Sequence, residues 1–279
     1  DRSPSRGLGD VYKRQIYGAY LKHQETLRER DKHVFHASSA GSCYRKQMYS
    51  YYDYPSDAKD DKSLRLLRLG TLVHKDMEEA LSMYEDKLAD MQIKDAPIQR
   101  SIHIEEKIKI KELDVVGTFD SGERIEDGTS IEFNLYDYKT AAAYKWTTKF
   151  GRTKNRVAST DTNYKLQLGT YALAIRHKYE PDRINMYLVW YNKNTSQMRE
   201  QIVSNEWIDK ALKYWTDMFE MKEDMGKRFE DELIPEDTLG VPVQDWECRY
   251  CQYYSICPST LADKKPRFSI NPKFFKEKQ

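Results

Sequence analysis

Apolar residues recur along the chain with two different periods, and these periods divide it into helices and strands. Between residues 63 and 84 they recur every three or four residues, which predicts one long amphipathic helix. The same spacing predicts helices over residues 163–177 and 207–225. The apolar positions of the first helix are Leu66, Leu69, Val73, Met77 and Leu81.

Four segments between these helices have the pattern of strands. Ile102 and Ile104 alternate with polar residues, and residues 113–120 and 131–139 are separated by a turn at residues 126–128. Residues 184–191 form a further apolar strand. The order is helix, three strands, helix, strand, and then a helical, loop-rich C-terminal part. This order favours an α/β fold over an all-α or all-β one.

Composition limits the possible classes of protein without selecting one. The chain has 279 residues, of which 33% are charged and 39% hydrophobic, a balance typical of soluble globular proteins. Its net charge of +1 does not by itself indicate a nucleic-acid-binding protein, although acidic metal ligands can offset basic DNA contacts. No apolar run approaches the about 20 residues of a membrane helix, and no secretory signal is present. We therefore expect a cytoplasmic protein of a bacterial, archaeal or phage-infected cell.

The first residues do not resemble the rest of the chain. It starts DRSPSRGLGDVYKRQ, without Met, and this run resembles translated sequencing-adapter read-through. We therefore expect residues 1–15 to be a non-native or disordered tail, and the true N-terminus stays open. A floppy native tail is the alternative.

Acidic side chains, an imidazole and a lysine lie in three short segments. His74 and Glu78 are four residues apart, so they share one helix face. Asp120 closes the segment Gly117-Thr-Phe-Asp120, which we place at the end of a strand. Asp137 and Lys139 are two residues apart on the next strand and face the same side, whereas the residue between them faces away.

These segments together predict a metal site. Neighbouring strands lie about 4.8 Å apart, so Asp120 and Asp137 can reach one ion. Two carboxylates and an imidazole suit Mg²⁺ or Mn²⁺, with water and phosphate oxygens completing the ligands. Taken singly, each residue has a simpler explanation: a salt bridge, a turn or a helix surface. No Ser/His/Asp grouping, GxxxxGK[ST] or GxGxxG motif is present to favour a different chemistry.

A fourth motif, Gln167-Leu-Gly-Thr-Tyr171, follows on the next predicted helix. With G-x-x-x-H, G-x-x-D and D-x-K in that order, the chain resembles the RecB-like branch of the PD-(D/E)XK nuclease superfamily over roughly residues 37–258. The resemblance implies a restriction-endonuclease-like core with a mixed central sheet flanked by helices. It also implies a metal-dependent deoxyribonuclease, more an exonuclease than an endonuclease, and DNA rather than RNA as the substrate.

The resemblance divides the chain and assigns its residues. It implies an N-terminal helical segment over 16–62, a nuclease core over 63–205, a C-terminal helix and cysteine segment over 206–262, and a basic tail over 263–279. The implied metal ligands are His74, Asp120, Asp137 and the backbone carbonyl of Tyr138. Lys139 would orient or activate the attacking water, and Gln167 and Tyr171 would position the lysine or the DNA backbone. Asp137 stands where many relatives have Glu, and the role of Glu78 stays open.

Four cysteines suggest a second inorganic site. Cys43 stands alone, whereas Cys248, Cys251 and Cys257 form C-x₂-C-x₅-C. Disulfides are disfavoured in a cytoplasmic chain, and four thiolates satisfy either Zn²⁺ or an iron–sulfur cluster. A subset of RecB-like nucleases, including CRISPR-associated exonucleases, has one cysteine before the core and three after it. This resemblance implies a 4Fe–4S cluster that joins the helical N- and C-terminal elaborations, with zinc as the alternative.

Basic residues interleaved with aromatic ones follow the D-x-K strand. These basic residues are Lys145, Lys149, Arg152, Lys154 and Arg156. Their neighbours Tyr144, Trp146 and Phe150 suit base stacking, so the stretch predicts contacts to single-stranded DNA. A solvated, flexible loop is the alternative.

The function that this reading predicts is an exonuclease acting on single-stranded DNA or DNA ends in recombination, replication or repair. It could be phage-encoded and could work with a helicase or another recombination or replication partner. A CRISPR-adaptation nuclease that processes spacer precursors would carry the same motifs. Two further alternatives are a non-catalytic DNA-binding protein with the same fold and a zinc-stabilised interaction module.

Overall fold

The computed structural model describes residues 5–28, 31–91, 98–152, 161–228 and 247–257. Its helices are α1 (Ser5–Thr26), α2 (Tyr44–Tyr51), α3 (Asp61–Met91), α4 (Ala143–Phe150), α5 (Thr162–Tyr179) and α6 (Glu206–Arg228). Its strands are β1 (Phe35–His36), β2 (Gln99–Ile110), β3 (Val115–Glu126), β4 (Ile131–Ala141), β5 (Arg183–Asn192) and β6 (Met198–Val203).

The six strands form one mixed sheet in the order β1-β3-β4-β5-β6, with β2 paired to β3. β3 and β4 form an antiparallel hairpin, whereas β4 and β5 run parallel because α5 crosses between them. The two edges of β3 differ. β2 pairs along one edge, and β1 and β4 share the other, at residues 115–116 and 121–126. Between these two segments β3 has no paired neighbour on that edge among the described strands.

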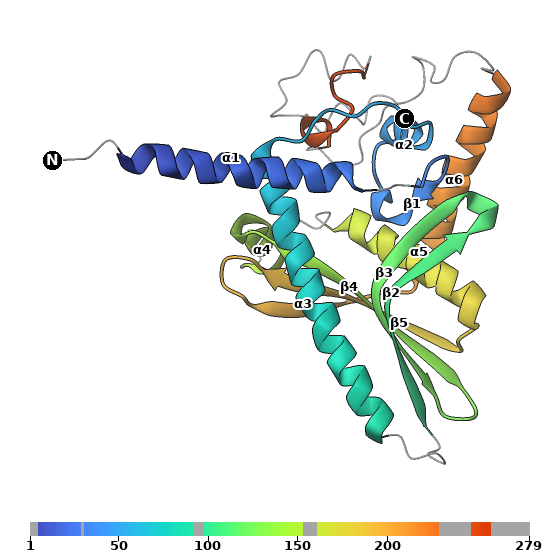
Figure 1. The fold of residues 1–279 in the computed structure, drawn as a ribbon. Coiled ribbons are helices and arrows are strands. Elements are labelled where there is room, and N and C mark those ends of the chain that lie inside the picture. Colours follow the sequence, from blue (N-terminus) through green and yellow to red (C-terminus); the bar gives the residue numbers. More distant parts are fainter. Residues whose placement is uncertain (1–4, 29–30, 92–97, 153–160, 229–246, 258–279) are drawn as a thin grey trace.

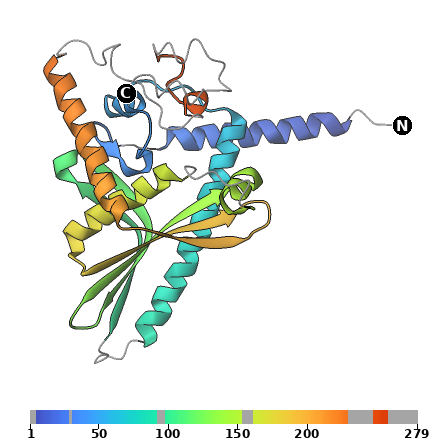
Figure 2. The same ribbon diagram turned by 180° about the vertical axis from the view of Figure 1, so that it is seen from behind.

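Helices cover both faces of the sheet (Figure 1). α3 lies across one face, where it contacts β2, β3 and β4. α5 lies on the other face and is covered in turn by α6, which Figure 2 shows from behind. Residues 166–175 of α5 are all buried, because this helix lies between the sheet and α6. α1 projects away from the body in both views. No helix in the described part of the chain has the length and apolarity that a membrane crossing requires.

The core fills the layer between the sheet and α5–α6. Phe35, Phe119 and Phe133 come from the strands and are fully buried. Trp215 of α6 packs against Phe35 and donates its indole N–H to Thr170 of α5, at 2.7 Å. The two helices approach closely at Gly169, where an added Cβ would lie 2.2 Å from the Trp207 backbone oxygen.

The α/β class, the mixed sheet and the helices that flank it are confirmed, and so is the hairpin turn at residues 126–128. The end of β3 was predicted wrongly: Asp120 lies inside the strand, which continues to Glu126. β6 was not predicted, and residues 143–150 form α4 rather than a loop. Residues 5–15 lie within α1, although they were expected to form a tail. The proposed division into segments stays a prediction.

Only part of the apolar side of α3 packs into the hydrophobic core. Leu66 and Leu69, which share the helical spacing, are about half exposed. Met77 and Leu81 instead line a groove over the sheet. The periodicity therefore identified the helix correctly but did not show how little of its surface is covered.

Two glycine substitutions should change stability in opposite directions. Gly169→Ala should lower the free energy of unfolding by about 1–3 kcal/mol, because the added methyl group meets backbone that can move only with α6. Gly70→Ala should raise the free energy of unfolding by about 0.8–1 kcal/mol, because alanine has a higher helix propensity than glycine. The added Cβ would lie 3.6 Å from Thr140 Oγ1, an ordinary van der Waals distance. Urea unfolding of both variants measures this difference, and equal effects would contradict the packing described.

Candidate active site

The hairpin of β3 and β4 opens at one point, and the acidic residues lie there. Ser121 pairs with Tyr136 as the last pair of the ladder, so the next residues in register are Asp120 and Asp137. Beyond this point, which we call the fork, the two backbones no longer pair. The Tyr138 N–H instead donates to Asp120 Oδ2 at 2.5 Å. A carboxylate thus replaces the missing ladder partner and holds Asp120 beside the start of the D-x-K segment.

α3 brings His74 to the same place. Its Nδ1 lies 3.4 Å from Asp120 Oδ1, and its ring meets the Tyr138 ring edge-on, with centroids 6.0 Å apart. Burial lowers the pKa of His74, but the hydrogen bond and charge of Asp120 outweigh burial and raise it above its ordinary value. His74 and Asp120 are therefore neighbours although 46 residues separate them in sequence.

Asp137 is the most unusual group of the site. Its side chain has 0% exposure, and its Oδ1 has no hydrogen-bond donor among the described residues. The Lys139 Nζ lies 2.6 Å from Oδ2 as an ion pair. Burial raises the pKa of Asp137, although Lys139 draws it down. A buried carboxylate oxygen without a donor is costly, so the lone pairs of Oδ1 are available to a cation.

Lys139 stays charged in this setting. Burial lowers the pKa of its ammonium, but the Asp137 and Asp120 carboxylates outweigh burial and raise it above its ordinary value. Its Nζ also lies 5.1 Å from the centroid of the Tyr164 ring. The site therefore holds a fixed positive charge next to two carboxylates.

Gln167 and Tyr171 reach the fork from α5. The Gln167 Nε2 donates to the Tyr171 hydroxyl oxygen at 2.8 Å. Tyr171 is buried, and burial, followed by the charge of Asp137, holds the pKa of its phenol well above the ordinary value. At Gly117 an added Cβ would lie 3.0 Å from the Tyr171 ring and 2.8 Å from Ala37 Cβ. The glycine of the G-x-x-D segment thus allows Tyr171 to approach the strand closely.

Sequence reasoning missed Glu105. The pairing of β2 with β3 places it opposite Asp120, and its backbone is left-handed, with φ of 46°. Burial, followed by the charges of Asp120 and Glu78, raises the pKa of Glu105 to about 7, and Glu78 also forms a hydrogen bond with it. Glu78 therefore faces this site rather than only solvent. The adjacent pair Glu105–Glu106, which breaks the alternation of the strand, was the available signal.

The residues at the fork fit a hard divalent cation. Among the described residues, no three His, Cys, Asp or Glu side chains stand in a ready-made metal-binding arrangement. The chemistry of the donors nevertheless suits Mg²⁺ or Mn²⁺: two neighbouring carboxylates, one of them with an oxygen that has no donor, and an imidazole. The roles predicted for His74, Asp120, Asp137 and the Tyr138 carbonyl stay predictions.

The two segments that carry the cysteines lie near each other, but within the described residues the cysteines do not stand in a ready-made metal-binding arrangement. Cys43 precedes α2, and the turn that holds Cys248, Cys251 and Cys257 lies near α2 (Figure 1). The Cys43 N–H donates to Glu247 Oε1 at 3.2 Å, which links residues 204 positions apart. All four cysteines are free and partly buried.

Burial dominates the chemistry of these thiols. It raises the pKa of Cys43 to about 12 and that of Cys248 to about 11, and charge repulsion from Cys251 adds to both. Without a cation, Cys43 and Cys248 therefore carry protonated thiols at neutral pH. A bound metal would have to displace these protons, so the affinity of such a site would fall as pH falls.

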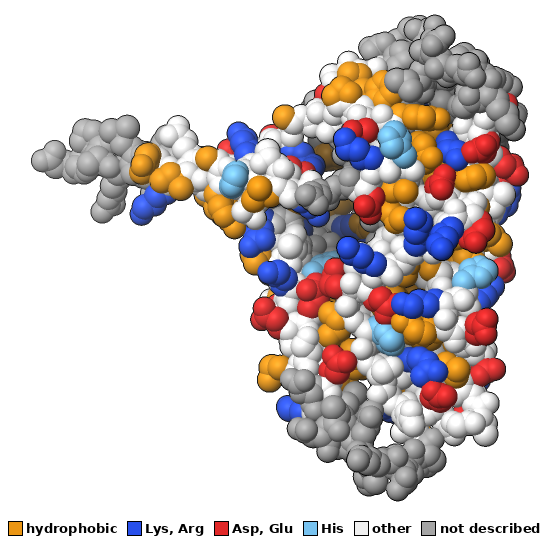
Figure 3. Space-filling model, turned by 45° about the vertical axis from the view of Figure 1, so that its right-hand side comes forward, with side chains coloured by type: hydrophobic (Ala, Val, Ile, Leu, Met, Phe, Trp, Pro, Cys, Tyr) orange, Lys and Arg blue, Asp and Glu red, His pale blue; other side chains and the backbone are white. Residues whose placement is uncertain are grey.

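The basic stretch is only partly available to a ligand. Lys149 forms an ion pair with Asp161, and both side chains are less than a tenth exposed, at 8% and 4%. The Lys145 Nζ donates to the Tyr164 hydroxyl at 2.8 Å. Arg152 is exposed, whereas Lys154 and Arg156 lie outside the described residues, as does the basic tail. Figure 3 shows basic and acidic side chains interspersed over the face that it presents.

A comparison with protein families matches residues 20–258 to the PD-(D/E)XK nuclease superfamily. The match covers most of the chain, and the chain therefore belongs to this superfamily. The fold agrees, because the helix with His74 is followed by three strands, α5 and β5. No curated protein sequence shows a significant match.

Solved structures resemble the chain at low identity. A protein called SSO0001 shares 13% identity with a TM-score of 0.45, covering 88% of this chain and 95% of its own. A candidate exonuclease from Eubacterium rectale shares 13% identity with a TM-score of 0.42, covering 84% and 89%. An alkaline exonuclease from Laribacter hongkongensis shares 13% identity with a TM-score of 0.36, covering 79% and 100%. The assignment rests on the family match.

The Asp161–Lys149 pair should give the protein a measurable acid sensitivity. Burial raises the pKa of Asp161, but hydrogen bonds from Lys149 and Gln201 outweigh it and lower that pKa. Asp161→Asn should reduce the free energy of unfolding at pH 7 by about 3 kcal/mol, because Lys149 is left buried without its partner. The stabilisation by Asp161 is present above the unfolded pKa of about 4 and is lost as pH falls through the lower folded value.

The measurement is the difference in unfolding free energy between wild type and Asp161→Asn, followed from pH 7 to the acid limit of folding. The difference in unfolding free energy should become smaller as the pH falls. Asp217→Asn is the control, since Asp217 pairs with Lys213 one turn away at an exposed position, and it should change stability by less than about 1 kcal/mol. A difference between wild type and Asp161→Asn that stays constant with pH would contradict the ion pair.

Proposed function

We propose that this chain is a metal-dependent DNA nuclease that hydrolyses phosphodiester bonds at the fork of β3 and β4. It acts as an exonuclease on single-stranded DNA or DNA ends, in recombination, replication or repair. The observation that carries the proposal is the buried Asp137 carboxylate, whose Oδ2 pairs with Lys139 and whose Oδ1 has no hydrogen-bond donor among the described residues, beside Asp120 and His74. The order of the four sequence motifs supports the exonuclease and DNA assignments.

His74, Asp120, Asp137 and the Tyr138 carbonyl would hold one Mg²⁺ or Mn²⁺ ion, which supplies a more acidic water and offsets charge on the phosphate. The Tyr138 N–H keeps the Asp120 carboxylate at the fork through its hydrogen bond to Oδ2. The interaction of His74 with Asp120 fixes the imidazole against the other oxygen of this carboxylate. These two contacts support a ligand set that the hairpin and α3 would hold before a substrate arrives.

Lys139 supplies the positive charge that the reaction needs. Its ammonium pairs with Asp137, so it would orient or activate the attacking water and offset charge on the phosphate. The water oxygen forms the new bond to phosphorus, and the bond between phosphorus and the leaving sugar oxygen breaks. Gln167 holds the Tyr171 hydroxyl by a hydrogen bond at 2.8 Å, so that the packing around Asp137 stays fixed. These two are positioning residues.

We further propose that Cys43, Cys248, Cys251 and Cys257 hold a 4Fe–4S cluster, with zinc as the alternative. Support comes from the free state of the four cysteines and from the Cys43–Glu247 hydrogen bond, which brings the two cysteine segments together. The role of such a centre would be structural, because it would join segments that the core separates by about two hundred residues.

Asp137→Asn should abolish cleavage while the protein stays folded. The change removes the charge that faces the cation and Lys139 but keeps the size of the side chain, so the rate should fall by at least about 100-fold. The measurement is cleavage of end-labelled single-stranded DNA with Mn²⁺. Asp209→Asn is the matched control on α6, with a side chain 79% exposed, and should cleave like wild type. Cleavage by Asp137→Asn at the wild-type rate would end the catalytic assignment.

Purification without air should yield a brown protein with iron and acid-labile sulfide, and Cys43→Ser should lose both. Cys43 is the informative position, because it alone comes from the N-terminal side of the core. Elemental analysis distinguishes the alternatives, since stoichiometric zinc in a colourless protein selects the zinc site. Absence of both metals from freshly purified wild-type protein would contradict a four-thiolate centre.

A further inference from the structure

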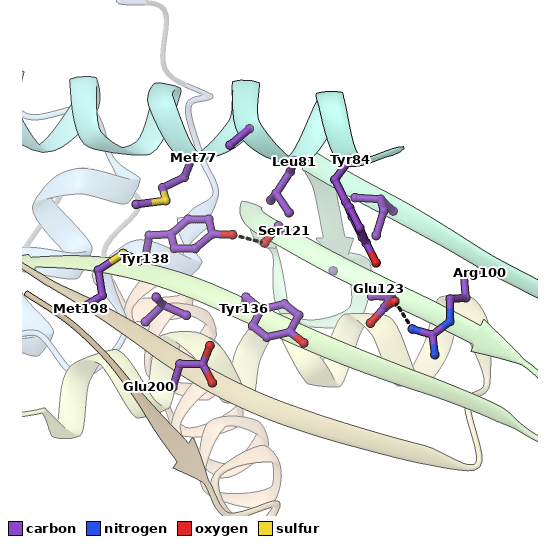
Figure 4. Close-up of a pocket in the computed structure, with 14 residues that line it drawn as sticks. Met77, Leu81, Tyr84, Arg100, Ser121, Glu123, Tyr136, Tyr138, Met198 and Glu200 are labelled. Carbon is purple, nitrogen blue, oxygen red and sulfur yellow. Dashed lines mark hydrogen bonds and ion pairs between the residues drawn. The ribbon is translucent and has the colours of Figure 1, made fainter. Parts of the chain in front are cut away.

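A groove lies between α3 and the face of the sheet, next to the fork. It encloses about 450 Å³, a size typical of sites for small ligands. Met77, Leu81 and Tyr84 descend into it from α3, and Tyr136 and Tyr138 rise from β4 (Figure 4). The lining is therefore mainly aromatic and thioether or aliphatic surface.

The groove continues the candidate active site. His74, Met77, Leu81 and Tyr84 succeed one another at helical spacing, so the stripe that begins at His74 runs along α3 for roughly 15 Å. Tyr138 belongs to both parts, since its ring meets His74 and also lines the groove. Its hydroxyl and the Ser121 Oγ are 2.8 Å apart and form part of the floor. Tyr136 and Tyr138 face α3, whereas Asp137 and Lys139 face α5, so a strand bound at the fork would reach this stripe from the side of His74.

Charge decides which part of a nucleotide the groove accepts. The charged residues that line it are Glu123, Glu200 and Arg100, and Arg100 forms an ion pair with Glu123 at 2.8 Å. Two carboxylates against one guanidinium disfavour a phosphate. Flat aromatic surface favours a neutral ring, because bases stack on aromatic side chains whatever their sequence. The Glu200 carboxylate can also accept a hydrogen bond from the amino group of a base.

We propose that this groove binds the unpaired bases of the DNA strand whose phosphate lies at the fork. This inference rests on the proposed function and narrows its substrate to strands with free bases: single-stranded DNA or a frayed end. Bases within a duplex are stacked and paired, so they cannot enter a groove beside α3 without being unpaired first. The phosphates of the same strand stay on the outer side, away from Glu123 and Glu200.

The test measures binding in the presence of a chelator, so that no strand is cut. Fluorescence anisotropy would follow a labelled oligothymidine strand, a duplex of the same length and an abasic strand that keeps the phosphates but has no bases. Tyr84→Ala should weaken binding of the oligothymidine by about tenfold, as expected for one lost stacking partner. It should leave the weaker binding of the abasic strand unchanged. Tyr84 is 47% exposed on a helix, so its removal should not impair folding.

Two further variants complete the design. Met83→Ala changes the neighbouring residue of α3, which is 63% exposed and does not line the groove, and it should bind like wild type. Ala80→Leu adds apolar bulk inside the groove without a ring that could stack, and it should weaken binding as Tyr84→Ala does. Equal losses for the oligothymidine and the abasic strand, or no loss in either groove variant, would overturn the proposal.

Cleavage assays separate this inference from the proposed function. Asp137→Asn should keep the binding preference for free bases while losing cleavage. If wild type binds single strands through Tyr84 but cuts no DNA, the groove stands and the nuclease assignment fails. If wild type cuts DNA and Tyr84→Ala binds and cuts like wild type, the groove assignment is wrong and the nuclease assignment is unaffected.

Discussion

The hydrogen bond from the Tyr138 N–H to Asp120 Oδ2 is the interaction on which the site depends. β3 carries β1 and β4 on the same edge, and neither of them pairs with residues 117–120. A backbone N–H buried at such a gap needs an acceptor, and the Asp120 side chain supplies it. The same contact fixes the position of Asp120 relative to Asp137, one register step past the ladder. An interruption of the sheet thus becomes the point where polar groups can gather inside a folded core.

The rest of the site is arranged around this interruption on both sides of the sheet. α3 contributes His74 and Glu78, β2 contributes Glu105, and α5 contributes the Gln167–Tyr171 pair. Burial of the Asp137 carboxylate is costly, and the Lys139 ammonium offsets only part of that cost. Proteins tolerate such groups where function requires them, and this tolerance explains why the motif residues, rather than ordinary core residues, occupy the fork.

Much of this arrangement could be predicted from the sequence, because hydrophobic periodicity and motif order are local properties. The helix around His74, the hairpin and the D-x-K strand were identified from residues close together in the chain. The position of Glu105 was not, since it depends on the pairing of β2 with β3 and on a left-handed backbone. The environment of Lys149 also depends on a residue that its sequence neighbours do not reveal. Its sequence neighbours suggested a nucleic-acid contact, but its ammonium is engaged by Asp161 on the far side of an undescribed segment.

The contact between Cys43 and Glu247 has a consequence for the order of events during synthesis. The hydrogen bond closes a loop that contains every strand of the sheet except β1, together with α3, α5 and α6. Such a long closure carries a large entropic penalty in an unfolded chain but a small one after the intervening residues have become compact. We therefore expect the sheet to form first during synthesis. The contact between Cys43 and Glu247 then forms after the intervening residues have folded. A chain that ends before residue 247 would lack the Glu247 carboxylate that accepts the Cys43 N–H.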